Sequence, residues 1–334
     1  MPNCPKCGRK FGSLQALNDH FRSMHPNERF VPPKQPSSAR TLMVVIVIVI
    51  IVIGSSVGYL GYTQIAHTSA TTTVNVCDSC VGQQVPADLL ANLTGVSSST
   101  LSTIGKQPTS SVAAPSSITG SALTSNGKPE ILYIGAEYCP FCAMERWPLI
   151  IALSKFGTFS NLTLMLSSPT DTAGENIATF SFVNSTYSSP YISFVPIEFE
   201  DRFGNPLQTI PPADSSIQST YDSGGSIPFV DLGNSYKIVG AQVINTNLMR
   251  VGGSASGAPL NWTQVASVLN DPNNALAKAI GGAANTLITA ICKLTGGNPS
   301  SVCTESYANL SLALYFGQSS PIVSVAIPSK LKVT

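Results

Sequence analysis

The chain has 334 residues, 18 Lys and Arg against 17 Asp and Glu, and only 10% charged residues. Average soluble domains carry about 25% charged residues. Because the 43% apolar content is ordinary, uncharged polar residues and glycine have replaced the missing charge. These values exclude a charge-rich disordered chain, a collagen and a coiled coil, and the length suggests roughly two domains.

Four residues near the N-terminus have the spacing C-x2-C-x12-H-x4-H, which suits a tetrahedral zinc site. Phe11 and Leu17 lie between them, at the two apolar positions that form the small core of such a domain. A segment this short needs a bound metal ion to fold, because it buries little apolar surface. Residues 1–26 therefore resemble a C2H2 zinc finger of ββα fold, with Zn²⁺ ligands Cys4, Cys7, His20 and His25.

The partner of this finger is left open by the sequence. In DNA-binding C2H2 fingers, helix positions −1, 3 and 6 contact bases. Here they are Ser13, Ala16 and Asp19, none of which is the Arg that most often reads a base. A single, weakly basic finger also binds nucleic acid weakly. We expect a protein partner, with weak nucleic-acid binding or a purely structural role as the alternatives.

Residues 27–41 are rich in Pro and basic side chains and predict an extended linker. Residues 42–62 carry no charge and begin with twelve aliphatic or Met residues, which predicts one transmembrane helix. A cleaved signal peptide is the alternative, but about 40 residues are too many to precede one. Residues 1–62 have a net charge of +5 and the rest of the chain −4. The positive-inside rule then predicts a single-pass cell-membrane protein with a cytoplasmic N-terminus and an extracytoplasmic C-terminal domain.

The composition of the outer part of the chain changes near residue 128, from Ser- and Thr-rich to apolar runs. Residues 63–127 are rich in Ser and Thr and predict a loosely structured N-terminal part, with short helices over 85–93 and 98–104. Beyond it, short apolar runs predict buried strands, and longer periodic runs predict helices. The predicted strands are 131–135, 161–166, 192–199, 226–232 and 235–239, and the predicted helices are 143–156, 261–280 and 283–295.

The order strand, CxxC, helix, strand and then Ile-Pro before a hairpin resembles the thioredoxin superfamily. In that fold the CxxC begins the first long helix and faces a proline in cis. Cys139-Pro140-Phe141-Cys142 is similar to the CPxC of glutaredoxins and periplasmic thiol oxidases, and Ile227-Pro228 matches the cis-proline position. The resemblance implies an α/β, thioredoxin-like domain over 128–280 with an insertion around 167–222, followed by a helical C-terminal extension over 281–334.

A second resemblance is more specific. The string Tyr-Ile-Gly-Ala-Glu-Tyr-Cys-Pro-Phe-Cys-Ala, followed by Glu145-Arg146-Trp147, is similar to domain-of-unknown-function family 929, an archaeal and actinobacterial group. Ser226-Ile-Pro-Phe229 also matches that family. This resemblance implies the same fold, and it implies no substrate.

The chemistry of the outer CPFC follows from its position. A cysteine at a helix N-terminus lies near free N–H groups and the positive end of the helix dipole, which stabilise a thiolate. Cys139 is therefore the expected nucleophile, and Cys142, three residues later, is the expected resolving thiol. The resemblance implies that Pro228, with Ser226 and Ile227, offers backbone hydrogen bonds to an extended substrate. A permanent disulfide is the alternative for this pair in an exported protein.

The remaining outer cysteines predict structural bonds. Cys77 and Cys80 form a second CxxC, for which a disulfide within the pair or to another cysteine is expected. A relay pair serving Cys139 and Cys142 is the alternative. Cys292 and Cys303 flank a turn and predict a local disulfide that stabilises the C-terminal region.

Together these features predict a membrane-anchored, extracytoplasmic thiol–disulfide oxidoreductase acting on the thiols and disulfides of exported proteins. Zn²⁺ in the finger is the expected metal, and no organic cofactor is expected. One alternative is a non-catalytic, thioredoxin-like binding or signalling ectodomain coupled to the cytoplasmic finger. A membrane-tethered transcription regulator is the other.

Overall fold

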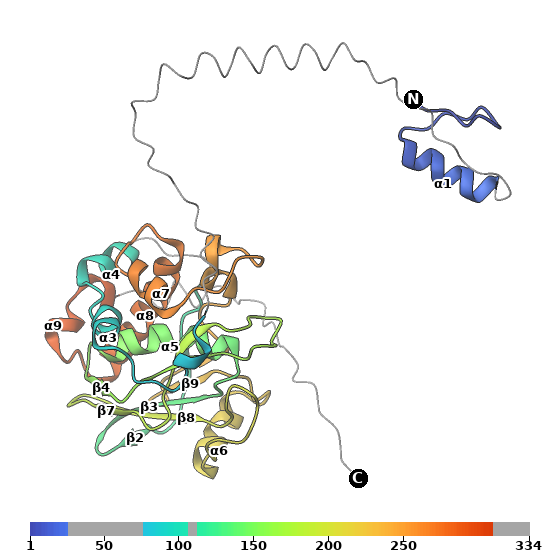
Figure 1. The fold of residues 1–334 in the computed structure, drawn as a ribbon. Coiled ribbons are helices and arrows are strands. Elements are labelled where there is room, and N and C mark those ends of the chain that lie inside the picture. Colours follow the sequence, from blue (N-terminus) through green and yellow to red (C-terminus); the bar gives the residue numbers. More distant parts are fainter. Residues whose placement is uncertain (26–75, 106–111, 310–334) are drawn as a thin grey trace, which may run out of the picture. The chain divides into compact units, whose positions relative to one another are not determined.

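A computed structural model describes residues 1–25, 76–105 and 112–309 of the chain (Figure 1). The linker expected over 27–41, the transmembrane helix expected over 42–62 and residues 310–334 of the expected C-terminal extension lie outside the described residues. The chain divides into two compact units, Met1–Ala70 and Thr71–Thr334.

Within residues 1–25, the described part of the N-terminal unit, the chain forms one helix, α1 (Leu14–Met24). The Ser13 side chain caps it by accepting a hydrogen bond from the N–H of Ala16 at 3.1 Å. In place of the β-hairpin that the ββα resemblance implies, the preceding chain forms a single antiparallel bridge between Asn3 and Lys10. Leu17 and Phe21 are buried on one side of α1, with Phe11 packed against them.

The C-terminal unit has a six-stranded mixed sheet with β3 (Lys128–Gly135) at its centre. β8 (Ser193–Glu198) pairs with β3 in parallel, and β9 (Phe229–Leu232) pairs with it antiparallel. β10 (Tyr236–Val239) continues antiparallel from β9. The two short outer strands are β1 (Ser116–Ser117), which pairs with β10, and β2 (Thr124–Ser125), which pairs with β3.

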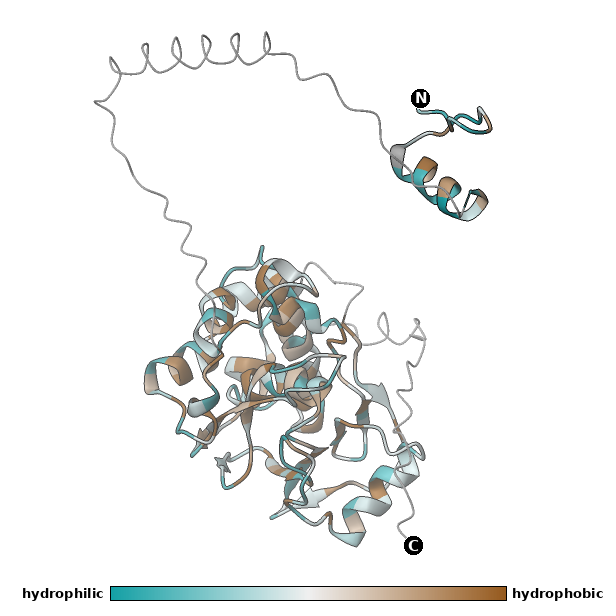
Figure 2. Ribbon diagram, turned by 45° about the vertical axis from the view of Figure 1, so that its right-hand side comes forward, coloured by the Kyte–Doolittle hydropathy of each residue, from teal (hydrophilic) through white to brown (hydrophobic). Residues whose placement is uncertain are grey.

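Helices cover both faces of this sheet, which is why β3 is almost entirely buried. α5 (Pro140–Leu153) and α8 (Ala275–Leu294) pack on each other and on the face that carries Ile131 and Tyr133. α6 (Pro212–Tyr221) packs on the face that carries Leu132 and Ile134, since strand side chains alternate (Figure 1). Hydrophobic residues concentrate where α5 and α8 meet the sheet, and hydrophilic residues lie mainly outside (Figure 2).

Smaller helices surround α8 on the same side of the sheet as α5. They are α3 (Ala87–Thr94), α4 (Ser98–Gly105), α7 (Trp262–Val268) and α9 (Ser300–Cys303). The described residues of this unit also form four 3-10 turns, η1 (Asp78–Cys80), η2 (Thr246–Met249), η3 (Val251–Gly253) and η4 (Ser306–Ala308).

The segment between α5 and α6 differs from the expectation. The predicted strand 161–166 is β5 (Thr163–Leu166), but it pairs with β6 (Ala178–Ser181) in a separate two-stranded sheet. β4 (Thr158–Ser160) pairs with β7 (Thr186–Ser188) in another. The parallel neighbour of β3 is β8, which corresponds to the strand predicted over 192–199, so the segment interpreted as an insertion supplies a strand of the six-stranded sheet.

The C-terminal helices also differ from the expectation. The helices predicted over 261–280 and 283–295 are in fact a short α7 and one continuous α8, so the domain boundary expected at residue 280 falls inside a helix. Among the described residues, α8 is the one helix long and apolar enough to cross a membrane. Of its most apolar stretch, 83% is buried inside the protein, as in a core helix.

Candidate functional site

Cys139 lies where β3 leads into α5 and is the N-cap residue of that helix. Its Sγ accepts a hydrogen bond from the N–H of Cys142 at 3.3 Å. Pro140 is the first helical residue, a position that suits proline because no N–H is left unpaired there. Neither cysteine is disulfide-bonded, and Cys142 is fully buried whereas Cys139 keeps 5% exposure. The predicted CxxC therefore begins a helix as a pair of thiols.

The segment around Pro228 lies against this pair. The Ile227–Pro228 peptide bond is cis, and Cys139 Sγ lies 3.9 Å from the carbonyl oxygen of Ile227. Ser226, by contrast, uses both backbone groups inside the protein. Its N–H donates to the Asp222 carboxylate at 2.5 Å, and its carbonyl accepts from Gln218 at 3.1 Å. Both backbone groups of Ser226 thus already have a hydrogen-bond partner inside the protein.

The two thiols differ in acidity. A hydrogen bond from the Cys142 thiol lowers the pKa of Cys139, and the neighbouring backbone N–H groups and the charge of Arg146 lower it further, against the effect of burial. Burial raises the pKa of Cys142 well above its ordinary value. Cys139 is therefore the thiol that ionises first, and Cys142 holds its proton.

A buried ion pair that the sequence did not reveal lies one helical turn beyond Cys142. Arg146 Nε and Nη2 donate to the two carboxylate oxygens of Glu198 at 2.8 and 2.7 Å, and both side chains have no exposed surface. Arg146 Nη2 also donates to the carbonyl oxygen of Ala136 at 2.9 Å. The pair holds the Arg146 guanidinium, whose charge lowers the pKa of Cys139, and it joins α5 to β8.

Two carboxyl groups near the CxxC in sequence are buried. Glu137 accepts a hydrogen bond from the Ser181 hydroxyl at 2.5 Å, and burial raises its pKa. Glu145 has no exposed surface and accepts one hydrogen bond, from the N–H of Gln242 at 2.8 Å. Its other oxygen has no hydrogen-bond partner, and burial raises the pKa of Glu145 to about 8. Glu145 therefore carries a proton near neutral pH.

Glu145 makes the stability of the fold depend on pH. Folding raises its pKa from 4.5 to about 8, so the folded protein keeps a proton that the unfolded chain loses. This stabilisation is complete below pH 4.5 and is lost as the pH rises to 8, by at most about 1.4 kcal/mol per pH unit. We expect Glu145→Gln to reduce the fall in unfolding free energy between pH 5 and pH 8, as measured by urea denaturation. The same pH slope in both proteins would contradict this role.

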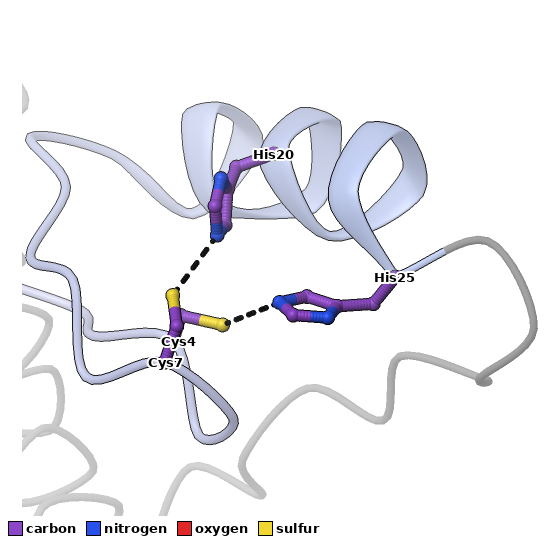
Figure 3. A group of neighbouring side chains, drawn as sticks. All are labelled: Cys4, Cys7, His20 and His25. Carbon is purple, nitrogen blue, oxygen red and sulfur yellow. Dashed lines mark hydrogen bonds between the residues drawn. The ribbon is translucent and has the colours of Figure 1, made fainter.

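The N-terminal unit brings together all four predicted metal ligands (Figure 3). Their donor atoms lie within 4.8 Å of one another. Cys7 Sγ is 3.3 Å from His20 Nε2, and Cys4 Sγ is 3.7 Å from His25 Nε2. Around a tetrahedral zinc ion, a sulfur and a nitrogen ligand lie about 3.6 Å apart, given the usual bond lengths. The donor set and its spacing therefore fit one zinc-sized ion.

Both disulfides that the sequence predicts outside the CPFC are present. Cys77 is bonded to Cys80, and Cys292 is bonded to Cys303. The second bond ties the end of α8 to α9, which confirms the local disulfide predicted there. For Cys77, the structure selects the partner within its own CxxC.

Comparison with known proteins identifies the family. A model of a domain of unknown function, DUF929, matches residues 115–293. No curated protein and no solved structure matches the chain. The matched region includes the central strands, the CxxC, the Ile227–Pro228 segment and nearly all of α8, and it exceeds half of the chain. The chain therefore belongs to the DUF929 family.

Proposed function

We propose that the C-terminal unit is a thiol–disulfide oxidoreductase that acts on exported proteins. The observation that carries this proposal is the asymmetry of the CxxC, with an acidic Cys139 at the start of α5 and a fully buried Cys142 hydrogen-bonded to it. With the two small sheets (β4 with β7 and β5 with β6), the 3-10 turns and α7 set aside, the order β3–α5–β8–α6–β9–β10–α8 supports a thioredoxin-like interpretation. In that order the strand before the CxxC is central, and the Ile-Pro segment precedes the antiparallel hairpin.

The chemistry follows from these positions. The Cys139 thiolate attacks a substrate disulfide, forming a mixed disulfide and releasing one substrate thiolate. Cys142 then loses its proton and attacks Cys139 Sγ, which releases the second substrate thiolate and leaves Cys139 bonded to Cys142. The two protons lost by the cysteines pass to the two substrate thiolates. The reverse sequence oxidises a substrate dithiol.

The reduction potential of the Cys139–Cys142 pair tests this proposal. Stabilisation of the Cys139 thiolate favours the reduced form, so we expect a potential above about −230 mV, in the range of glutaredoxins and stronger oxidants. Equilibration of the full chain in glutathione buffers, with the oxidised fraction read by alkylation and mass spectrometry, measures it. A potential below about −300 mV would indicate a permanent structural bond and overturn the proposal.

We propose a single-pass location in the cell membrane, with the C-terminal unit outside. Two disulfides lie in that unit, and structural disulfides form mainly in oxidising compartments. The Cys and His cluster needs reduced thiolates, which suits the cytoplasm. The uncharged segment over 42–62 separates the two in sequence. Labelling of intact cells with a membrane-impermeant thiol reagent tests the orientation, since Cys139 is expected to react and Cys7 is not.

For the N-terminal unit we propose a Zn²⁺-dependent fold that binds a protein partner, with weak nucleic-acid binding as the alternative. Because its apolar core consists of little more than Leu17, Phe21 and Phe11, metal binding supplies the folding free energy. Cys7→Ser is therefore expected to weaken Zn²⁺ binding by at least about 100-fold and to unfold α1. Titration of the full chain with Co²⁺, followed by its thiolate absorption bands, measures this effect. Ser23→Ala, also in α1, serves as the control, and unchanged Co²⁺ spectra in Cys7→Ser would contradict the site.

A second candidate function is a thioredoxin-like binding or signalling domain without catalysis, coupled to the finger. It is favoured by the finger itself, which an oxidoreductase does not need. Differential alkylation of intact cells separates the two functions. A Cys139–Cys142 pair that is never found reduced favours the binding domain.

A further inference from the structure

The second outer CxxC, formed by Cys77 and Cys80, plays no part in the activity proposed above. Both cysteines are partly exposed, whereas the disulfide-bonded Cys292 and Cys303 are buried. The Cys77–Cys80 bond spans 3 residues and the Cys292–Cys303 bond spans 11, so the first restricts the unfolded chain less. Exposed disulfides are the ones that exchange readily. These properties are those of an exchangeable bond more than those of a structural one.

An ion pair is one of the contacts that hold the turn carrying this disulfide, beside the packing of both cysteines against the core. Asp78, between the two cysteines, accepts a hydrogen bond from Arg202 Nη1 at 2.8 Å. Arg202 Nη2 donates to the side-chain oxygen of Asn176, also at 2.8 Å. The Arg202 side chain is only 7% exposed, and that of Asp78 is 78% exposed. Arg202 is thus held inside the protein, and the exposed Asp78 of η1 binds to it.

Backbone hydrogen bonds connect Asn176 to the residue before Cys139. Its backbone N–H donates to the carbonyl oxygen of Ser168 at 3.0 Å, and the N–H of Ser168 donates to the carbonyl oxygen of Tyr138 at 2.8 Å. Tyr138 immediately precedes Cys139. A continuous set of hydrogen bonds therefore joins the turn at Asp78 to the residue before the nucleophile.

A second set of contacts places the same segments together. The N–H of Glu137 donates to the carbonyl oxygen of Glu200 at 2.9 Å, two residues before the anchoring Arg202. Glu137 also shares the lining of a pocket of about 460 Å³ with Gly82 and Gln84, which directly follow the Cys77–Cys80 turn. The two CxxC motifs thus border the same part of the C-terminal unit.

We propose that Cys77–Cys80 is the redox partner of Cys139–Cys142 within the same chain. This inference rests on the thiol–disulfide activity proposed for Cys139 and Cys142, and it names the pair with which they exchange. The exposed Asp78 makes its ion pair with Arg202 weak, because solvent screens it. The residues after η1 are also hydrogen-bonded to β5, from the N–H of Gly82 to the carbonyl oxygen of Leu164 and from the N–H of Leu164 to that of Gln83, both at 2.8 Å. An approach of η1 to Cys139 therefore requires release of the ion pair and of these two hydrogen bonds.

The exchange is balanced without an outside reagent. The Cys139 thiolate attacks one sulfur of the Cys77–Cys80 disulfide and releases the other as a thiolate. Cys142 then gives up its proton and attacks Cys139 Sγ, forming the Cys139–Cys142 disulfide and releasing the second cysteine of the pair. The two protons lost by Cys139 and Cys142 end on Cys77 and Cys80, and two electrons pass to the Cys77–Cys80 pair.

Trapping of the intermediate tests this proposal. In full-length Cys142→Ser the resolving thiol is missing, so a disulfide from Cys139 to Cys77 or Cys80 is expected to accumulate. Non-reducing peptide mapping by mass spectrometry identifies it. Adding Cys77→Ser and Cys80→Ser is the matched control and removes the link. An intact Cys77–Cys80 bond beside a free Cys139 thiol in Cys142→Ser would overturn the proposal.

The number of disulfides delivered gives a second measurement. The fully oxidised wild-type chain is expected to oxidise two equivalents of a reduced peptide dithiol. After the first equivalent, the Cys77–Cys80 disulfide reoxidises Cys139 and Cys142, which then oxidise the second. Cys77→Ser/Cys80→Ser is expected to deliver one, and Cys139→Ser none. Two equivalents from the double variant would refute the relay and leave the oxidoreductase intact. No delivery by the wild type would refute the oxidoreductase itself.

Discussion

Cys139→Ser is expected to lower the rate of disulfide reduction or refolding of scrambled substrate by at least about a thousandfold, because the variant has no nucleophile. Cys142→Ser is expected to lose turnover as well, but for a different reason. Its Cys139 still attacks, and the mixed disulfide with substrate accumulates because nothing resolves it. Insulin reduction by the full-length chain, followed by turbidity, measures the rates, and non-reducing electrophoresis detects the trapped complex.

The disulfide at the end of α8 supplies the control for this comparison. Cys292→Ser/Cys303→Ser removes two cysteines far along the chain from the CxxC, and it reports any general effect of losing cysteines. Equal turnover in wild type and Cys139→Ser would show that Cys139 is not the nucleophile and would leave the binding function as the better account.

The second large effect concerns the buried pair of Arg146 and Glu198. Arg146→Met leaves the Glu198 carboxyl buried without its partner, so we expect a loss of about 3–5 kcal/mol in unfolding free energy. The charge of Arg146 also lowers the pKa of Cys139, so its removal is expected to shift the alkylation of Cys139 to higher pH. Urea denaturation and the pH profile of iodoacetamide reaction measure the two effects.

A double variant separates stability from thiol acidity. Arg146→Met/Glu198→Leu removes both charges, and well-packed apolar residues in place of a buried ion pair are often neutral for stability. It is therefore expected to regain most of the lost stability and to keep the raised Cys139 pKa. Arg146→Lys keeps the charge but loses the two-point contact, so it is expected to be less stable with a nearly unchanged pH profile. If the pH profile of Cys139 alkylation instead returned to that of the wild type in every variant that regained stability, Arg146 would act only on folding.

The parts of the fold that could be predicted from the sequence depend on local patterns. The apolar run 131–135 and the hairpin at 229–239 are continuous in sequence, and they form β3, β9 and β10 close to the predicted bounds. The CxxC and the Cys and His cluster were found because ligand spacing is itself a local signal. The Arg146–Glu198 pair was missed because its partners are 52 residues apart, and only the pairing of β8 with β3 brings them together.

The helix break expected near Gly281 is an error of another kind, because here the sequence predicts a feature that the structure lacks. The helices predicted over 261–280 and 283–295 leave Gly281 and Gly282 between them, and glycine lowers helix propensity. In the structure both lie inside α8, where the lack of a side chain lets α4 approach closely. A Cβ on Gly281 would lie 2.7 Å from Ile104 Cδ1. The cost to the helix is thus offset by packing against a residue 177 positions earlier in the chain, which no local pattern reveals.

The composition of α8 has a consequence for the proposed export of the C-terminal unit. A secreted chain passes through a translocon that moves sufficiently apolar helices sideways into the lipid, and α8 has the length and hydropathy to be tested in this way. Lys278, Lys293 and the central Asn285 oppose that transfer, because charged and amide side chains are costly in hydrocarbon. In the folded unit the Asn285 side chain instead donates to the carbonyl oxygen of Leu101 at 2.8 Å. In the proposed export, the same polar group that joins α8 to α4 would thus also disfavour retention of the helix in the membrane.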